Sequence, residues 1–289
     1  MTRTEPDLAV CEIEPGRTPW ALEKLPPLPA VAIRLLQLLA QDDVDIGRVG
    51  LSISAEPVFA ADVLQNANSA LYGLREQVRT VAQAVVVLGT ERLKGICLTR
   101  AFRMFVMPVM GTAALQRCWR NSLAGAVIAE RLAYACGLNP DVAYTAGLLR
   151  DIGRLALLVK YPGPYTNMLA VSQEQGYDPV VSERDLFDID HCQAGAWLLG
   201  RMPFPAELRD VVAKHHQSSS SQSFGLVNLV GAADRVADAL GFGVLALPPW
   251  ADFEETMQEL PAAARARFDC DPSELEKDVE SRIQAVCGI

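Results

Sequence analysis

Apolar residues recur along most of this chain at the three- and four-residue spacing of a helix that is buried on one face. The segment PAVAIRLLQLLAQ begins at Pro29 and places Val31, Leu35 and Leu38 near one side. No stretch shows the sustained alternation of apolar and polar residues that is typical of a half-buried strand. The pattern therefore predicts an all-α protein.

Capping residues mark where several helices are expected to begin or end. Thr80 and Gln83 form a capping-box pattern ahead of AVVVLG, and Thr90 is suited to cap a helix that starts at Glu91. Gly137 is suited to end a long helix in the left-handed conformation. Besides the helices after Thr80 and Thr90, the signals predict helices over residues 29–41, 45–54, 57–73, 112–137, 140–162, 164–175, 182–201, 205–216, 224–240 and 272–286.

Breaks in the helical pattern suggest how the chain is organised. The stretch Pro108–Gly111 is the best candidate for a boundary between two helical subdomains, and QSSSSQS at residues 217–223 is expected to form a surface loop. The predicted organisation is an extension over 1–19, a first helical half over 20–110, a second helical half over 111–242, and a helical tail over 243–289.

Composition and charge narrow the possible partners. The chain has 289 residues, of which 50% are hydrophobic and 21% charged, and its net charge is −9. Its longest apolar runs are shorter than the roughly 18 residues that a membrane span requires, and the first twenty residues lack the apolar core of a secretory signal. The acidic charge disfavours direct binding to nucleic acid. We therefore expect a cytoplasmic protein without a membrane or nucleic-acid partner.

Two further features of the composition are a basic segment and the cysteines. The segment TERLKGICLTRAFR concentrates Arg92, Lys94, Arg100 and Arg103, which either face solvent or form a basic surface for an anion or a partner. The seven cysteines are scattered singly, without a C-x-x-C motif, and are expected to be reduced and packed as small apolar residues.

The sequence GLLRDIGRLALL raises the main chemical question, because it carries Arg150 and Asp151 inside an apolar helical stretch. Such charges are rarely buried unless they are paired. The pair is either a solvated face near a bend at Gly153 or the remnant of a metal site. The three histidines of the chain all lie downstream, as does Asp234, and imidazole with carboxylate suits a divalent metal. Spacing alone is weak evidence for such a site.

Motifs for other chemistry are missing from the sequence. It contains no G-x-S-x-G, no P-loop and no G-x-G-x-x-G, and no Cys-His motif announces a nucleophile. We therefore expect no cofactor.

Three ordered blocks resemble the HDOD family (HD-related output domain). These are LEKLPPLPAVAIRLLQLLAQDD, then ISAEPVFAADVLQNANSALYG, then AVVVLGTERLKGICL. The later segments WRNSLAGAVIAERLA, AYTAGLLRDIGRLALL, DIDHCQAGAWLLGRMPFPAELRDVVAKHH and LVNLVGAADRVADALG look like the second half of the same family. The resemblance covers roughly residues 20–242, and the tail matches no motif.

The resemblance also implies a set of site positions, because HDOD domains are similar to the HD and HD-GYP metal phosphohydrolases. Asn121 and Arg150 stand where those enzymes have histidine ligands, whereas the other positions keep residues able to bind a metal: Asp151, His191, His215, His216 and Asp234. Guanidinium has no lone pair to donate and stays charged. We therefore expect no bound metal, with Arg150 taking the place of the cation between Asp151 and Asp234. The alternative is that Arg150 turns to the surface and the remaining residues hold one ion.

The function that the resemblance implies is that of a non-enzymatic bacterial signal-transduction module, which binds a protein or a small ligand. One alternative is a residual metal-dependent phosphohydrolase or phosphodiesterase. Another is a sensor for a nucleotide second messenger, with Arg150, His215 and His216 as anion contacts. The oligomeric state, the upstream signal and the partner stay open.

Two groups of residues outside this site also have two interpretations. The polar block that comprises Asn66, Asn68, Ser69 and Tyr72 either links neighbouring helix ends or lines a groove between the halves. Trp119 and Trp197 are expected to be core anchors rather than recognition residues.

Overall fold

The computed structural model describes residues 18–41, 43–69, 74, 76–217, 224–245, 252–268 and 270–287, and in these residues it contains helices and no strand. The predicted all-α class is confirmed. The helices are α1 (Ala30–Leu39), α2 (Ile46–Ser54), α3 (Pro57–Ala67), α4 (Val81–Val106), α5 (Ala113–Cys136), α6 (Pro140–Leu149), α7 (Ile152–Lys160), α8 (Pro162–Gln175), α9 (Pro179–Phe187), α10 (His191–Leu199), α11 (Ala206–Lys214), α12 (Leu226–Ala239), α13 (Phe253–Gln258), α14 (Ala262–Arg265) and α15 (Pro272–Cys287), with short 3-10 helices at Trp20–Leu22 and Met107–Val109.

Capping residues mark several helix ends in the structure, among them Thr80 and Gly137 as predicted. Thr80 and Gln83 form a reciprocal capping box at the start of α4, and Asn139 accepts hydrogen bonds from two main-chain N–H groups at the start of α6. Gly137 ends α5 with φ 72°, in the left-handed region. Just before Thr90, Gly89 has φ 74° and ψ 169°, which interrupts α4 between its two predicted parts. Local sequence therefore determines these helix ends.

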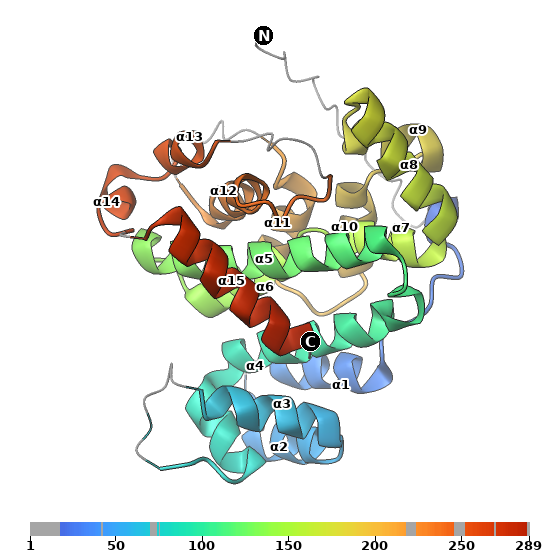
Figure 1. Ribbon diagram of the computed structural model, residues 1–289. Coiled ribbons are helices and arrows are strands. Elements are labelled where there is room, and N and C mark those ends of the chain that lie inside the picture. Colours follow the sequence, from blue (N-terminus) through green and yellow to red (C-terminus); the bar gives the residue numbers. More distant parts are fainter. Residues whose placement is uncertain are drawn as a thin grey trace.

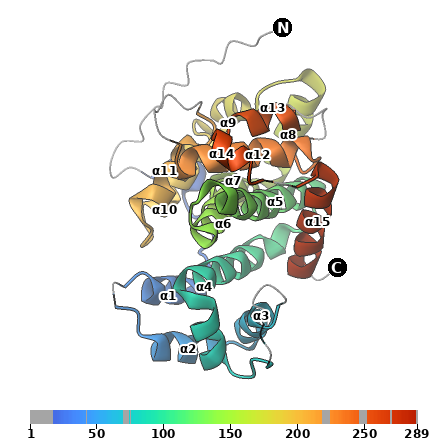
Figure 2. The same cartoon turned by 90° about the vertical axis from the view of Figure 1, so that its left-hand side faces the viewer.

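Two hydrophobic clusters form the core. The first joins α1, α2, α3 and α4 as far as Ala101, and the second, larger cluster is built around α5 and α6. Figures 1 and 2 show α1 to α4 on one side of the molecule and the remaining helices on the other. Because α4 supplies Val85 and Leu93 to the first cluster and Phe102 and Val106 to the second, it connects the two. The division of the chain near residue 110 stays a prediction.

Three predicted helices have different limits in the structure. The helix expected over 57–73 ends at Ala67, because the Asn68 side chain donates to the Val78 carbonyl (2.9 Å) and accepts from the Val78 N–H (2.7 Å). The structural role of Asn68 is confirmed, whereas Tyr72 lies outside the described residues. The helix expected over 182–201 is two helices, since Asp188 takes a left-handed conformation with φ 58°.

The helix expected over 140–162 is also two helices, and the break falls on the Arg-Asp pair. Arg150 is the C-terminal cap of α6, and Asp151, with φ −101° and ψ 19°, precedes α7. The prediction that Asp151 lies in the middle of a helix was therefore wrong. The change of direction at this point allows both side chains to turn into the second core.

The predicted helical tail contains α13, α14 and α15 within its described residues. Helix α15 packs Leu275, Val279 and Ile283 against the second cluster and lies beside α5 (Figure 1). Trp119 is a core residue as predicted, whereas Trp197 is half-buried and lies under the Arg201 guanidinium. Among the described residues, no helix has the length and apolarity needed to cross a membrane.

Candidate metal centre and ion-pair network

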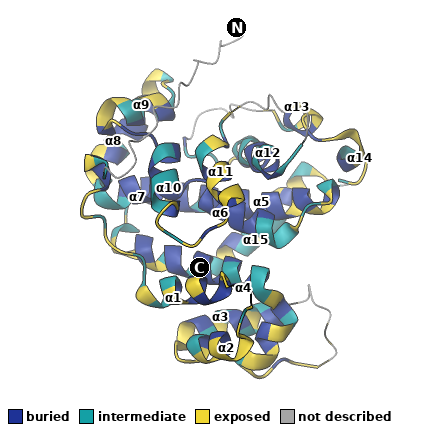
Figure 3. Ribbon diagram, turned by 180° about the vertical axis from the view of Figure 1, so that it is seen from behind, coloured by how far each residue is buried: buried dark blue, intermediate teal, exposed yellow. Residues whose placement is uncertain are grey.

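The seven positions expected from the sequence meet in the interior of the second half, where Figure 3 shows α5, α6 and α7 largely buried. They come from five places in the fold. The α6–α7 junction supplies two of them, α5 and α12 supply one each, the first residue of α10 supplies another, and the last two directly follow α11: Arg150 and Asp151, Asn121, Asp234, His191, His215 and His216.

Two glycines allow the helices to approach closely enough for these contacts. A Cβ atom at Gly125 of α5 would lie 2.1 Å from Arg150 Nη1. One at Gly153 of α7 would lie 2.0 Å from the main-chain oxygen of His191. Cβ atoms do not come this close to other heavy atoms. A larger residue at Gly125 would force Arg150 and α5 apart, and one at Gly153 would force α7 and α10 apart.

Arg150 is completely buried, and its guanidinium is surrounded by acceptors. Its Nε and Nη2 atoms each lie 2.9 Å from Asp234 Oδ1, and Nε lies 3.3 Å from Asp151 Oδ2. Nη1 donates to the Gly147 carbonyl at 2.8 Å, and Nη2 donates to the Asn121 side-chain oxygen at 2.6 Å. The side chain therefore points inward and bridges both carboxylates, while Asn121 offers its amide oxygen to the arginine.

The charges of these groups stabilise one another. Burial disfavours the charged form of Asp151, but Arg154 and Arg150 outweigh it and hold the pKa of this carboxyl well below its usual value. Burial likewise opposes ionisation of Asp234, yet Arg150 keeps its pKa low. For Arg150, the attraction of Asp234 and Asp151 exceeds the cost of burial and raises its pKa. The three groups thus form a buried, fully ionised network.

Two further members of this network were missed by sequence analysis. Arg154 donates to Asp151 at 3.1 Å and lies 3.4 Å from Glu183 of α9, and both side chains are buried. Glu183 accepts from the main-chain N–H of His191 at 2.7 Å and from the Tyr165 hydroxyl. Burial opposes its charge, but His191 and Arg154 outweigh this and lower the pKa of Glu183 to about 2. We call Asn121, Arg150, Asp151, Arg154, Glu183 and Asp234 the ion-pair centre.

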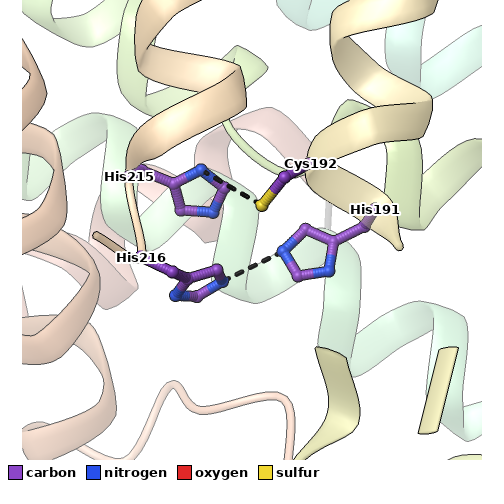
Figure 4. Close-up of side chains that lie close together, drawn as sticks. All are labelled: His191, Cys192, His215 and His216. Carbon is purple, nitrogen blue, oxygen red and sulfur yellow. Dashed lines mark hydrogen bonds between the residues drawn. The ribbon is translucent and has the colours of Figure 1, made fainter. Parts of the chain in front are cut away.

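Beside the ion-pair centre lies a group of four metal-binding side chains, which we call the histidine cluster: His191, Cys192, His215 and His216 (Figure 4). One ligand atom from each residue lies within 4.8 Å of the others. His191 Nε2 lies 3.0 Å from His216 Nε2, and Cys192 Sγ lies 3.9 Å from His215 Nδ1. Cys192 was not expected at the site, although it directly follows His191 in the sequence.

The protonation of the histidines follows from their partners. Burial and Arg154 disfavour a charge on His191, but Cys192 and Glu183 outweigh them and raise its pKa well above the usual value. His191 Nδ1 lies 2.6 Å from Glu183 Oε2, and His191 Nε2 lies 3.0 Å from His216 Nε2 and 3.1 Å from Arg154 Nη2. Burial and the neighbouring His216 hold the pKa of His215 well below its usual value, so His215 is neutral.

The orphaned Nε2 atom of His215 tests whether a metal fits the histidine cluster. His215 Nδ1 lies 3.1 Å from the Val212 carbonyl, while the buried Nε2 has no hydrogen-bond partner among the described residues and lies 3.9 Å from Asp151 Oδ1. Three imidazoles and a thiolate suit one tetrahedral ion such as Zn²⁺. The donors fit such an ion, provided that His191 and Cys192 lose their protons. The carboxylates that an HD-type centre adds are already bound by Arg150 and Arg154.

A family comparison agrees with this geometry. A family model described as HDOD domain matches residues 25–218. The chain belongs to the HDOD domain family. An uncharacterised protein of Treponema pallidum is 23% identical over 199 residues, which are 68% of this HDOD protein, and the chain spans 38% of that relative's length.

Solved structures support the HDOD fold. An HDOD domain protein of unknown function from Geobacter sulfurreducens is 25% identical, with a TM-score of 0.69 and 91% of each chain covered. A Shewanella amazonensis protein whose name proposes a phosphohydrolase is 25% identical, with a TM-score of 0.66 and coverage of 90% of this chain and 91% of that one. A Marinobacter aquaeolei protein whose name proposes signal transduction shares the fold, at 24% identity and a TM-score of 0.63 over 92% of this chain and 60% of that one.

Proposed function

We propose that this HDOD protein is a non-enzymatic signal-transduction module, in which the ion-pair centre holds the helices of the second half together. The observation that carries the proposal is the position of Arg150, which is completely buried and paired with both Asp151 and Asp234. A fixed positive charge thus occupies the place between the two carboxylates that the resemblance assigns to a cation.

Electrostatics opposes metal-dependent hydrolysis at the ion-pair centre. A divalent ion supplies the phosphohydrolases with Lewis acidity and with an activated water. At ~4 Å and an effective dielectric of about 20, Arg150 would repel such an ion by roughly 8 kcal/mol before relaxation. Arg154 adds a second buried cation next to Asp151. Asp151 and Asp234 are thus paired with arginine and are not free to bind a metal ion.

The same contacts bear on the idea that Arg150 is a nucleotide contact. All three guanidinium nitrogens of Arg150 already bind protein acceptors, and the side chain has no exposed surface. A phosphate at this point would have to displace Asp234 or Asn121. Arg150 therefore has a structural role, and a ligand would bind elsewhere on the molecule.

A turnover assay tests the proposed function. The purified protein is offered bis(p-nitrophenyl) phosphate and cyclic dinucleotides with Mn²⁺, Fe²⁺, Mg²⁺ or Zn²⁺, beside a His215→Ala variant. We expect both proteins to hydrolyse these substrates no faster than the metal ion does in buffer without protein. Metal-dependent turnover by the original chain that is lost in His215→Ala would overturn the proposal.

One observation favours the second candidate, a residual metal-dependent phosphohydrolase. The histidine cluster offers four metal-binding side chains, and within the described part of the chain the buried Nε2 of His215 makes no hydrogen bond. The Shewanella amazonensis relative, whose name proposes a phosphohydrolase, shares the fold. If this candidate is correct, Cys192→Ser and His215→Ala remove metal and turnover together. If the ion is only structural, they remove metal and lower the melting temperature without any turnover to lose.

A further inference from the structure

A cavity of about 620 Å³ lies between α3, α4, α5 and α15, which we call the α15 cavity. Figure 2 shows the C-terminal end of α15 near α4. No member of the ion-pair centre or of the histidine cluster lines this cavity, and α15 lies beyond residue 218, where the family match ends. Its volume falls within the range of small-molecule sites, roughly 300–1,000 Å³.

The lining of the cavity is basic, although the whole chain carries a net charge of −9. Among the described lining residues are three carboxylates, those of Asp62, Glu130 and Asp278, and five arginines. The arginines come from α4, α5 and α15: Arg92, Arg100, Arg103, Arg131 and Arg282. This excess of positive charge inside an acidic protein is a local feature that suits an anion.

Four of the five arginines have a carboxylate partner, and the five arginines still exceed the three lining carboxylates. Arg131 Nε lies 3.9 Å from Asp278 Oδ2, and Arg92 Nη1 lies 3.4 Å from Asp141 Oδ1. Glu130 is shared, because it pairs with Arg92 Nη1 at 2.5 Å and also with Arg282. Asp62 Oδ2 lies 3.5 Å from Arg100 Nε, which is buried and makes no hydrogen bond in the described chain. The cavity therefore retains charge and donor capacity toward a ligand.

Among the described residues, Arg103 is the arginine of this lining that forms no ion pair with a carboxylate. Its two terminal nitrogens donate to the main-chain oxygens of Val286 and Cys287, at 2.5 and 2.6 Å, at the last turn of α15. Neutral carbonyls are weaker partners for guanidinium than phosphate oxygens, which accept two parallel charge-assisted hydrogen bonds. Arg103 thus lines the cavity and also holds the last turn of α15 in place.

Aromatic and amide groups accompany the arginines. Tyr134 of α5 lines the cavity with 59% of its surface exposed, which leaves a ring face open to a planar group. Tyr144 is buried, and its hydroxyl lies 3.0 Å from Thr99 Oγ1. The amide side chains of Gln65 and Asn66 also line the cavity and can bind the edge of a heterocycle.

We propose that the α15 cavity binds a phosphate-bearing nucleotide, with Arg103 and Arg282 on the phosphates and Tyr134 against the base. Guanidinium groups match phosphate in geometry, and an aromatic face suits a nucleobase of any sequence. This inference goes beyond the proposed function, because it assigns a ligand class to a site that shares no residue with the ion-pair centre or the histidine cluster. The polar block around Asn66 then has a binding role besides the structural role of Asn68.

Isothermal titration calorimetry of the full chain in EDTA tests the proposal. The probes are AMP, GMP, ADP, GDP and inorganic pyrophosphate. We expect at least one nucleotide to bind at 1:1 stoichiometry with a Kd below about 1 mM, and pyrophosphate to bind at least about tenfold more weakly. Arg103→Gln and Arg282→Gln should each weaken nucleotide binding about tenfold or more.

Matched variants separate the cavity from general surface effects. Tyr134→Ala should weaken nucleotide binding about tenfold and leave pyrophosphate binding unchanged. The controls Tyr177→Ala and Arg209→Gln change residues that are exposed and do not line the cavity, so they should bind as the original chain does. Tyr134 is itself exposed, so its variant stays informative even if loss of Arg282 unfolds the protein.

Several results would overturn the proposal. Absence of heat from every nucleotide at about 1 mM would do so, as would binding that survives both arginine substitutions. Equal affinity for pyrophosphate and nucleotides, together with no effect of Tyr134→Ala, would refute the proposal that the nucleobase lies against Tyr134. The α15 cavity shares no residue with the ion-pair centre or the histidine cluster, and EDTA keeps metal binding out of the titration. A failure of nucleotide binding would therefore not contradict the proposed non-enzymatic function.

Discussion

Replacing Arg150 by methionine should destabilise the protein strongly, because it leaves Asp151 and Asp234 buried without their shared cation. Arg150 has no exposed surface and makes hydrogen bonds to Asp234, Gly147 and Asn121. Loss of one partner from such a buried pair costs about 3–5 kcal/mol. With a urea m-value near 3 kcal/mol/M, the unfolding midpoint should fall by about 1 M or more.

A matched control removes an exposed arginine from an ion pair. Arg120 binds Glu280 through two hydrogen bonds, at 3.2 and 2.6 Å, but its side chain is 43% exposed. Arg120→Met should therefore cost no more than about 1 kcal/mol. Urea unfolding followed by circular dichroism compares the two variants at the same pH.

The pH dependence of the effect has a defined sign. Arg150 lowers the folded-state pKa of Asp151 and Asp234, so the stability it adds is present above their unfolded pKa and is lost as pH falls through the folded values. The cost of Arg150→Met should thus keep its full value from pH 7 to about pH 5 and shrink as the pH falls below about 4. A cost equal to that of Arg120→Met, or one that does not change with pH, would refute the account of a buried ionised network.

Three other predictions concern stability. Gly153→Ala should destabilise the protein by about 3 kcal/mol, because the new methyl group would collide with a carbonyl of α10; a melting temperature within 2 °C of the original would contradict this. Burial and Asp234 raise the pKa of Asp238 to about 7, so its ionised form is disfavoured in the folded state and stability should decline from pH 4 to 8. Asp238→Asn should therefore gain about 2–4 kcal/mol at pH 8 and less than about 2 kcal/mol at pH 5 in urea titrations; equal gains at both values would count against it. Asn68→Ala should cost about 1–2 kcal/mol, since it removes both bonds to Val78, and an unchanged urea midpoint would show that these bonds are dispensable.

Residue patterns along the chain predicted the helices, most caps and the all-α class, because each depends on neighbours in sequence. They also predicted that Arg150 bridges Asp151 and Asp234, since the family resemblance places these positions in one site. The break between α6 and α7 was missed, because it depends on the contacts that Arg150 and Asp151 make in the core. No proline marks the break, and the Asp151 side chain does not cap α7.

Contacts between distant helices account for the rest of what was missed. Glu183 is one charge in an ordinary amphipathic helix, and only the fold brings it to Arg154 and His191. Cys192 looked like any scattered thiol, and the return of α11 toward α10 brings it to His215. For the α15 cavity, the sequence indicated a possible basic surface at Arg92, Arg100 and Arg103, but Arg282 lies far from them in sequence and only the fold brings α15 to α4.

Manganese binding tests the central claim most directly, since Mn²⁺ prefers oxygen ligands and would need Asp151 and Asp234. The metal content of the purified chain, after incubation with Mn²⁺ and gel filtration, would be measured by elemental analysis. If Arg150 takes the place of the cation, the chain carries well below one equivalent of Mn²⁺. One equivalent that disappears in Asp151→Asn would show that the carboxylates bind a metal and that the proposed role of Arg150 is wrong.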